Sequence, residues 1–262
     1  MAQTRRVFLT QAAAAGTITF LPFQARGASH AADSFETPAG PITVHPVDHA
    51  SIIFETPLGT IAVDPVGEMS AYDGLPKPDL ILVTHEHGDH FNEGILDGLM
   101  TDQTRLITNP AVYDKLPDDL KAKAESLGND DATAWNALGI AAIPAHNLTE
   151  GRMNFHPPGR DNGYVLTFEG FRVYISGDTE DIPEMRALQD IDLAFVCMNL
   201  PFTMDLEAAA SAVSDFAPRF VYPYHYRGRD GGTQDPMAFA ALIGDGTEVK
   251  FAPWYGDEIM PA

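Results

Sequence analysis

Cysteine is almost absent from the chain. Cys197 is the only one among 262 residues, so no intrachain disulfide can form. It lies in the apolar stretch DLAFVCMN, which predicts a buried strand and a small core side chain, not a nucleophile. Without a Cys-x-x-Cys pair, the sequence also lacks the ligands of the cysteine-based structural zinc sites.

Basic residues are few. Sixteen Lys and Arg stand against 37 Asp and Glu, which gives a formal net charge of −21 at pH 7. Such a charge repels phosphate backbones and anionic lipid surfaces, so nucleic acid and membrane surfaces are disfavoured as partners. We expect a small-molecule substrate instead, and no oligomeric state is predicted.

Long hydrophobic runs are also missing. A short apolar segment lies within residues 1–31, which contain paired Arg5 and Arg6, then an alanine-rich stretch, then small residues. This segment resembles the twin-arginine export signal of bacteria. Gly16 and Pro22 interrupt it, so it is too weak for a spanning helix, and no stable membrane insertion is expected after signal removal.

The resemblance to an export signal implies a processed protein. Cleavage after Ala31 would leave one domain over residues 32–262, delivered to the periplasm by the twin-arginine export machinery. The alternative is that residues 1–31 form a disordered or anchoring N-terminal helix.

The rest of the chain alternates apolar strand-like runs with polar loops and helical stretches. Strands are predicted at 42–47, 51–56, 60–65, 79–84, 139–145, 163–176 (a hairpin), 191–199, 219–224 and 248–254. Helices are predicted at 91–100, 109–116, 117–127, 182–190, 205–216 and 235–244. The order of strands followed by helices occurs twice along the chain. It indicates an α/β fold with two sheets and with helices on the outside.

A dense group of ligand-type side chains follows the apolar strand at 79–84. His85, His87, Asp89 and His90 lie within six positions, and strand ends are where sites are often assembled. Imidazole and carboxylate are ligands that zinc and similar divalent cations prefer. The zinc-protease pattern is absent, because Asp89 stands where its second histidine would be. The alternative is a charged surface turn.

The stretch THEHGDH resembles the His-x-His-x-Asp-His motif of the metallo-β-lactamase superfamily. That pattern requires a later His, then an Asp, then a last His, and the sequence offers His146, Asp178 and His225, each after an apolar strand. The resemblance covers nearly all of residues 32–262 and implies an αββα sandwich with the site at one edge.

Site roles follow from the resemblance alone. It implies that His85, His87 and His146 bind one metal, that Asp89, His90 and His225 bind another, and that Asp178 bridges them. Two divalent cations are expected, zinc first, with manganese or iron as alternatives. Asp89 and Asp178 would be the catalytic carboxylates beside a bridging hydroxide.

One position in this set has a competitor. His156 lies ten residues after His146 and in the same loop. We expect His146 to be the ligand and His156 to orient a ligand or face the substrate. If the loop folds differently, the two exchange roles.

Other residues are expected near the site. His49 and Asp64 resemble positions beside the site in the ascorbate-6-phosphate-lactonase-like branch of the superfamily, and a carboxylate such as Asp64 could orient a ligand imidazole. Tyr224, Tyr226 and Arg227 flank His225 and could contact an anionic substrate. For Asp64 a turn role, and for the tyrosines simple packing, are the alternatives.

The resemblance implies a metal-dependent hydrolase that cleaves a lactone, ester or phosphodiester of a small molecule. The same set of metal ligands is compatible with two alternative functions. One is an iron-dependent oxidoreductase, and the other is a metal-binding protein without turnover.

Overall fold

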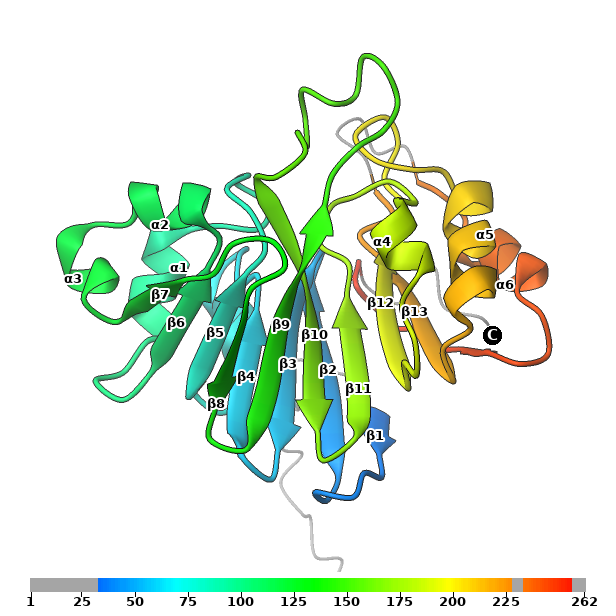
Figure 1. Ribbon diagram of the computed structural model, residues 1–262. Helices are drawn as coiled ribbons and strands as arrows, with labels where there is room; N and C mark the ends of the chain where they lie inside the picture. The colour runs from blue at the N-terminus through cyan, green and yellow to red at the C-terminus, as the bar shows by residue number, and fades with distance from the viewer. Residues whose placement is uncertain (1–32, 228–232, 256–262) are drawn as a thin grey trace, which may run out of the picture.

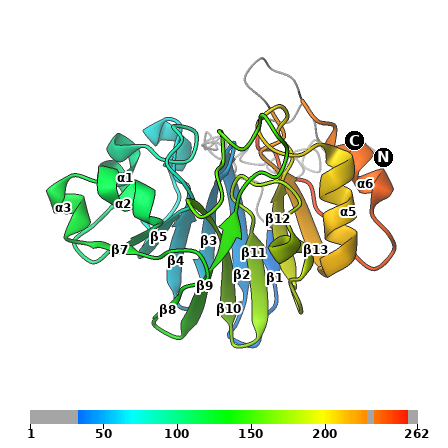
Figure 2. The ribbon, with the colours of Figure 1, turned by 45° about the horizontal axis from the view of Figure 1, so that its top comes forward.

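The computed structural model describes residues 33–227 and 233–255, so the expected export signal lies outside the described residues. Figure 1 shows two sheets packed face to face, with helices on the outer face of each. Figure 2 shows the same layers from above, with α1–α3 beyond one sheet and α4–α6 beyond the other. Within the described ranges, no helix is both long enough and apolar enough to cross a membrane.

Each sheet has seven strands. In the first, the strands lie in chain order: β1 (Asp33–Phe35), β2 (Ile42–Asp48), β3 (Ser51–Thr56), β4 (Gly59–Val63), β5 (Leu80–Val83), β6 (Arg105–Thr108) and β7 (Ala124–Ser126). In the second, they lie in reverse chain order: β14 (Glu248–Val249), β13 (Phe220–Tyr224), β12 (Leu193–Cys197), β11 (Phe171–Ile175), β10 (Asp161–Phe168), β9 (Leu138–Ala145) and β8 (Ala132–Trp135).

The helices are short. They are η1 (Met69–Tyr72, a 3₁₀ turn), α1 (Glu93–Leu99), α2 (Pro110–Lys115), α3 (Asp118–Lys121), α4 (Pro183–Arg186), α5 (Leu206–Phe216) and α6 (Pro236–Leu242). The predicted start of α5 is confirmed, because the Asp205 side chain accepts a hydrogen bond from the backbone N–H of Ala208 at 2.8 Å.

Successive side chains of a strand point to opposite faces of the sheet, and the interior therefore contains two hydrophobic cores. Ile52 and Phe54 of β3 face the second sheet, where the rings of Phe54 and Phe195 meet edge to face at 5.6 Å. Ile53, between them, packs outward among the side chains of α1–α3. The first sheet is thus buried on both faces, and the predicted αββα sandwich is confirmed.

The sequence-based prediction differs from the structure in several segments. Residues 117–127 have helical composition, yet the helix α3 ends at Lys121, and Ala124–Ser126 form β7. This strand pairs in parallel with β6, with Ala124 opposite Leu106. Pairing at the sheet edge overrides a weak local helix preference here. Strands β1, β6 and β8 were also not predicted.

The site lies where the parallel strands of both sheets end. Strands β4–β7 are parallel to one another, as are β11–β14, and open parallel sheets bind ligands beyond their carboxyl ends. Gly177, two residues after the end of β11, has φ +60°, and a Cβ there would lie 2.7 Å from the carbonyl oxygen of Asn162. Glycine therefore lets the end of β11 approach β10, which brings Asp178 to the site.

Candidate metal centre

The candidate site residues come from loops of both sheets. His85, His87, Asp89 and His90 follow β5, and Asp178 and His225 follow β11 and β13. His49 lies in the turn between β2 and β3, and His156 lies in the loop between β9 and β10, which rises above the sandwich in Figure 1. His49, Asp64 and His225 have φ between 44° and 52°, an uncommon conformation for residues with a Cβ, which is found at functional sites.

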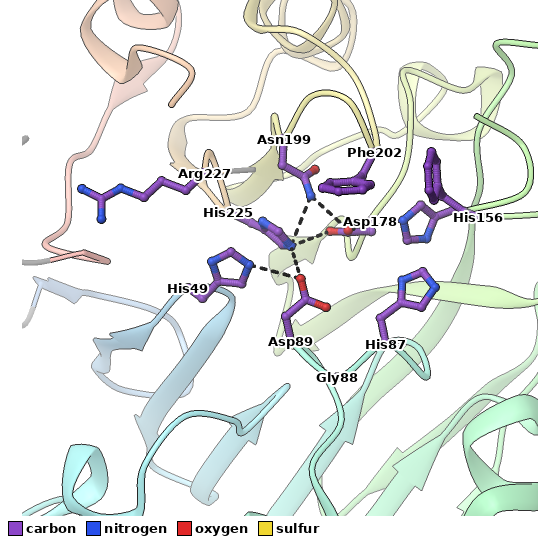
Figure 3. A pocket seen from close by; sticks show the side chains of 11 residues that line it. His49, His87, Gly88, Asp89, His156, Asp178, Asn199, Phe202, His225 and Arg227 are labelled. Atoms are coloured by element: carbon purple, nitrogen blue, oxygen red, sulfur yellow. Dashed lines mark hydrogen bonds and ion pairs between the residues drawn. The ribbon is translucent and has the colours of Figure 1, made fainter. Parts of the chain in front are cut away.

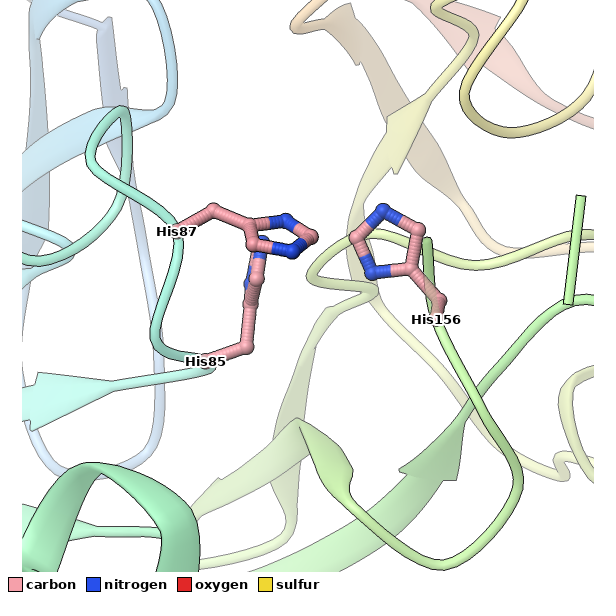
Figure 4. A group of neighbouring side chains, drawn as sticks. All are labelled: His85, His87 and His156. Carbon is pink, nitrogen blue, oxygen red and sulfur yellow. The ribbon is translucent and has the colours of Figure 1, made fainter. Parts of the chain in front are cut away.

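Three imidazoles form the first group. His85, His87 and His156 each offer a ring nitrogen, and the three nitrogens lie within 4.8 Å of one another. The ring centroids are 4.7–5.0 Å apart. Figure 4 shows the rings around a common space, with His156 opposite the other two. Such a set can hold one cation.

The structure differs from the sequence-based assignment at His146. Among the described residues, His146 joins no group of candidate ligands, whereas His156 does. The backbone of His146 is fixed beside the segment after Asp178, because its N–H and carbonyl bond the hydroxyl of Thr179 and the N–H of Glu180. The chain then turns back on itself, and the N–H of Asn147 donates to the carbonyl of His156 at 2.8 Å. This return places the imidazole of His156 where that of His146 was expected.

Asp178 lies between the first group and a second one. The second group contains His90, Asp178 and His225, and an adjoining set contains His49, Asp89 and His225. One oxygen of Asp178, Oδ1, lies 3.4 Å from Nε2 of both His90 and His225. The other, Oδ2, lies 3.4 Å from Nε2 of His156. The carboxylate thus faces both groups, as a bridging ligand would.

Asp89 completes the second group from the far side. Its Oδ2 lies 3.5 Å from Nε2 of His225 and 3.3 Å from Nε2 of His49 (Figure 3). The ring of His49 packs against that of His225 with centroids 3.8 Å apart, and its Nδ1 bonds the hydroxyl of Tyr255 at 2.7 Å. His49 therefore lies beside the site, as the sequence predicted.

Buried partners orient the histidines. Asp64 Oδ2 lies 2.7 Å from Nδ1 of His90, and Asp161 Oδ2 lies 3.0 Å from Nδ1 of His156. The hydroxyl of Thr84 lies 3.0 Å from Nδ1 of His85. Carboxylates behind imidazoles are typical of metal ligands. Asp64 thus lies where an orienting role was expected.

The sequence analysis missed Asp161. A carboxylate five residues after His156 was the available signal, but it becomes informative only once His156 is known to face the site. Arg160 donates two hydrogen bonds to this carboxylate, at 2.7 and 2.8 Å, and holds it in place.

The pKa values of the buried ionisable side chains in the site depend on one another. Burial opposes ionisation of Asp178, but the charges of His225 and His90 outweigh it and hold its pKa well below the usual range. Burial opposes protonation of His90, yet Asp178 and Asp64 raise its pKa well above the usual value. For His85, burial and the nearby His90 both act in one direction and lower the pKa, which keeps this imidazole neutral.

Unsatisfied polar atoms point to what the site binds. Nε2 of His85, His90 and His156 and Oδ1 of Asp178 are buried, and none has a hydrogen-bond partner within residues 33–227 and 233–255. Leaving such atoms unpaired is costly, so each calls for an explanation. All four are imidazole nitrogens or a carboxylate oxygen, they face one region, and such atoms are ligands of divalent cations, so the residues fit these cations.

A cavity of about 470 Å³ opens over these residues. Besides site residues, its lining includes Phe155, Asn199, Phe202 and Arg227. Phe155 and Phe202 form an edge-to-face pair with centroids 5.1 Å apart, which makes one wall apolar.

The two tyrosines beside His225 do not line this cavity. Tyr224 is fully buried and packs against Trp254, with ring centroids 5.9 Å apart, and Tyr226 packs against Tyr255 at 5.0 Å. Of the three flanking residues predicted to face the substrate, only Arg227 reaches the cavity, so the packing alternative holds for both tyrosines.

The chain is similar to known metal-dependent hydrolases in sequence and in fold. The chain matches the family described as the β-lactamase superfamily domain over residues 43–225. It is 34% identical over 180 residues to a UPF0173 metal-dependent hydrolase of Thermococcus kodakarensis, covering 65% of this chain and 77% of the relative. A crystal structure of a candidate metal-dependent hydrolase from Parabacteroides distasonis is 42% identical, with a TM-score of 0.77 over 85% of this chain and 98% of that one.

A more distant structure shares the fold. Igni18, a metallo hydrolase from Ignicoccus hospitalis, is 22% identical, with a TM-score of 0.65 over 80% of this chain and 94% of that one.

Proposed function

The chain belongs to the metallo-β-lactamase superfamily, in its UPF0173 family of metal-dependent hydrolases, and from this premise we propose that it cleaves a lactone, ester or phosphodiester of a small molecule at a centre of two divalent cations. The observation that carries the proposal is the position of Asp178. Its two oxygens face different histidine groups, 3.4 Å from His90 and His225 on one side and from His156 on the other.

Seven residues would hold the cations. His85, His87 and His156 would bind the first, and Asp89, His90 and His225 the second, with Asp178 shared. This set replaces the expected His146 by His156. The high share of imidazole favours zinc over magnesium or calcium, which prefer oxygen ligands. When bound, such ions act as Lewis acids and lower the pKa of water.

The protein's own residues prepare the site for hydrolysis. Asp64 and Asp161 fix the ring orientation of His90 and His156, so that each Nε2 faces the centre. The low pKa of Asp178 keeps its carboxylate ionised and able to share a cation. The aromatic wall of Phe155 and Phe202 limits water on one side of the cavity.

The volume and lining of the cavity also limit the size and chemical groups of the substrate. About 470 Å³ suits a small molecule and not a folded macromolecule. An apolar group of the substrate would pack against Phe155 and Phe202, and Arg227 at the rim would attract an anionic group. A lactone, ester or phosphodiester that carries both groups meets these conditions.

The function is tested by offering the zinc-loaded protein a panel of lactones, aryl esters and phosphodiesters. We expect turnover of at least one class, and a loss of that turnover of roughly 100-fold or more in Asp178→Asn, because the shared ligand is lost. An active Asp178→Asn variant would contradict the bridging role. A wild-type protein that purifies with one iron ion and hydrolyses none of the panel would favour the oxidoreductase alternative.

In this proposal, residues 1–31 direct the chain to the periplasm by the twin-arginine route. The support is the pair Arg5 and Arg6 ahead of an apolar, acid-free segment. Replacing both by lysine should retain the tagged protein in the cytoplasmic fraction. Periplasmic recovery equal to wild type would refute the assignment.

A further inference from the structure

Asn199 lies at the centre of the candidate site, although it is not a candidate ligand. It lies two residues after the end of β12, lines the cavity and is 1% exposed. Its amide nitrogen Nδ2 lies 3.2 Å from Oδ2 of Asp178 and 3.3 Å from Nε2 of His225 (Figure 3). The amide therefore reaches the same space as the candidate metal ligands.

The hydrogen-bond network determines which way this amide points. Nδ2 of Asn199 donates to Oδ2 of Asp178 at 3.2 Å, so the NH₂ end of the amide faces this carboxylate. On the other side, the hydroxyl of Thr203 donates to Oδ1 of Asn199, and the same hydroxyl oxygen accepts from the backbone N–H of Asn199 at 3.2 Å. Both ends of the amide agree on one orientation.

One of the two N–H groups then remains available. The first donates to Asp178. The second is directed at Nε2 of His225, which can accept only through its ring lone pair. If His225 is a metal ligand through this nitrogen, the lone pair is used, and the second N–H has no acceptor in the protein at that point. A buried N–H without an acceptor is costly unless a bound oxygen takes it.

We infer that the side-chain N–H of Asn199 is an oxyanion donor: it bonds the oxygen that becomes negative as the substrate is attacked. This inference rests on the proposed hydrolytic function. As the oxygen of a hydroxide ion bonds the carbonyl carbon, the C=O π pair moves to the carbonyl oxygen, and the Asn199 N–H stabilises that charge until the pair returns and the leaving alkoxide departs with the electrons of its own C–O bond. For a phosphodiester, the stabilised atom is a non-bridging phosphoryl oxygen. Fixed donors aimed at developing charge lower the barrier, because they need no reorganisation during the reaction.

Thr203 is the positioning residue for this donor. It is fully buried, and its hydroxyl holds the oxygen end of the amide. Without that hydroxyl the amide can rotate about its last bond and turn its N–H groups away from the centre. The effect of Thr203 on a bound anion would thus act through Asn199.

The experiment uses inorganic phosphate as a tetrahedral oxyanion and measures its Kd calorimetrically on the zinc-loaded protein, with zinc content determined for every sample. In Asn199→Ala we expect zinc content to be retained and phosphate affinity to fall roughly 10- to 100-fold, the loss of one hydrogen bond to a charged group. Thr203→Val should weaken phosphate in the same direction but less. Gln189→Ala removes an amide near the opposite end of β11, and it should bind phosphate as wild type does.

Unchanged phosphate affinity in Asn199→Ala would overturn the inference, and so would a wild type that binds no phosphate. Loss of zinc from Asn199→Ala would also overturn it, because the residue would then only support Asp178. Failure of the proposed function is a separate outcome. A wild type that binds phosphate through Asn199 but hydrolyses no substrate of the panel would refute hydrolysis and leave the donor in place. Where an ester is turned over, Asn199→Ala should lower kcat far more than it changes KM.

Discussion

The Asp64 carboxylate and the His90 imidazole form a hydrogen bond of 2.7 Å between Oδ2 and Nδ1, and both side chains are fully buried. The same carboxylate accepts two more hydrogen bonds from Thr84, from its N–H and its hydroxyl, each at 2.7 Å. Asp64 is thus fixed by β5 and in turn fixes the ring of His90. The proton is held on Nδ1, and Nε2 is left to face the centre.

Replacing Asp64 by asparagine tests this relationship. We expect Asp64→Asn to weaken zinc binding roughly 10- to 100-fold, because the neutral amide no longer holds His90 in the binding tautomer or raises its basicity. Competition with a chromophoric chelator gives the affinity. Asp97→Asn, an exposed carboxylate on α1, serves as the matched control and should bind zinc like the wild type. Equal affinities in the two variants would contradict the orienting role.

The exchange of His146 for His156 gives a second prediction. His156→Ala removes a ring that lies within 4.8 Å of its partners, so zinc content should fall by about one ion per chain. His146→Ala should leave zinc content close to that of the wild type. Elemental analysis of the two purified variants, side by side, decides the assignment. The opposite ranking would restore His146 as the ligand.

Metal binding should release protons. In the metal-free protein, burial disfavours a charge on His90 and His156, but carboxylates outweigh it and raise both pKa values, Asp178 and Asp64 at His90, and Asp161 and Asp178 at His156. The raised pKa values favour the doubly protonated form of both rings, and a cation on Nε2 must displace the proton there. The release should shrink as the pH rises through the raised pKa values, because the rings are then already neutral. Zinc titrations in two buffers of different ionisation enthalpy measure it, and no net release at pH 7 would contradict this charge state.

Cys197 should be inert in the folded protein. It is fully buried on β12, and burial raises the pKa of its thiol to about 12. Since the thiolate is the reactive form, an aromatic disulfide reagent at pH 8 should label the native protein at least roughly 100-fold more slowly than the denatured protein. Rapid native labelling would mean that the strand opens or that the thiol is accessible.

Much of the fold follows from local patterns. The apolar runs that became β3, β5, β11, β12 and β13 are long and well separated, and Gly170, with φ of 99°, suits the tight turn between β10 and β11. Strands β6 and β7 are short, and β7 forms one edge of the first sheet. Their state depends on pairing with a neighbour, which composition does not encode.

The candidate site likewise contains one part that local sequence predicts and one part that depends on distant contacts. His85, His87, Asp89 and His90 are adjacent in sequence, so their proximity follows from one turn after one strand. The choice between His146 and His156 depends on how a long loop closes. That path is fixed by remote contacts, such as the carboxylate of Glu180, which accepts from the backbone N–H groups of Leu148 and Thr149 at 2.7 Å.

Asn199 was missed for a different reason. A lone asparagine after a strand has no ligand pattern, and it gains meaning only from its distance to Asp178. Asp161 was overlooked for a related reason, since its partner His156 was expected beside the ligands and not among them.

The central claim is that Asp178 joins two cation sites in one chain. The most direct measurement is the zinc stoichiometry of the wild type and of Asp178→Asn, by elemental analysis after loading and removal of free metal. We predict two ions per chain in the wild type and at most one in the variant. One ion in the wild type, or two ions held with unchanged affinity by the variant, would contradict the account.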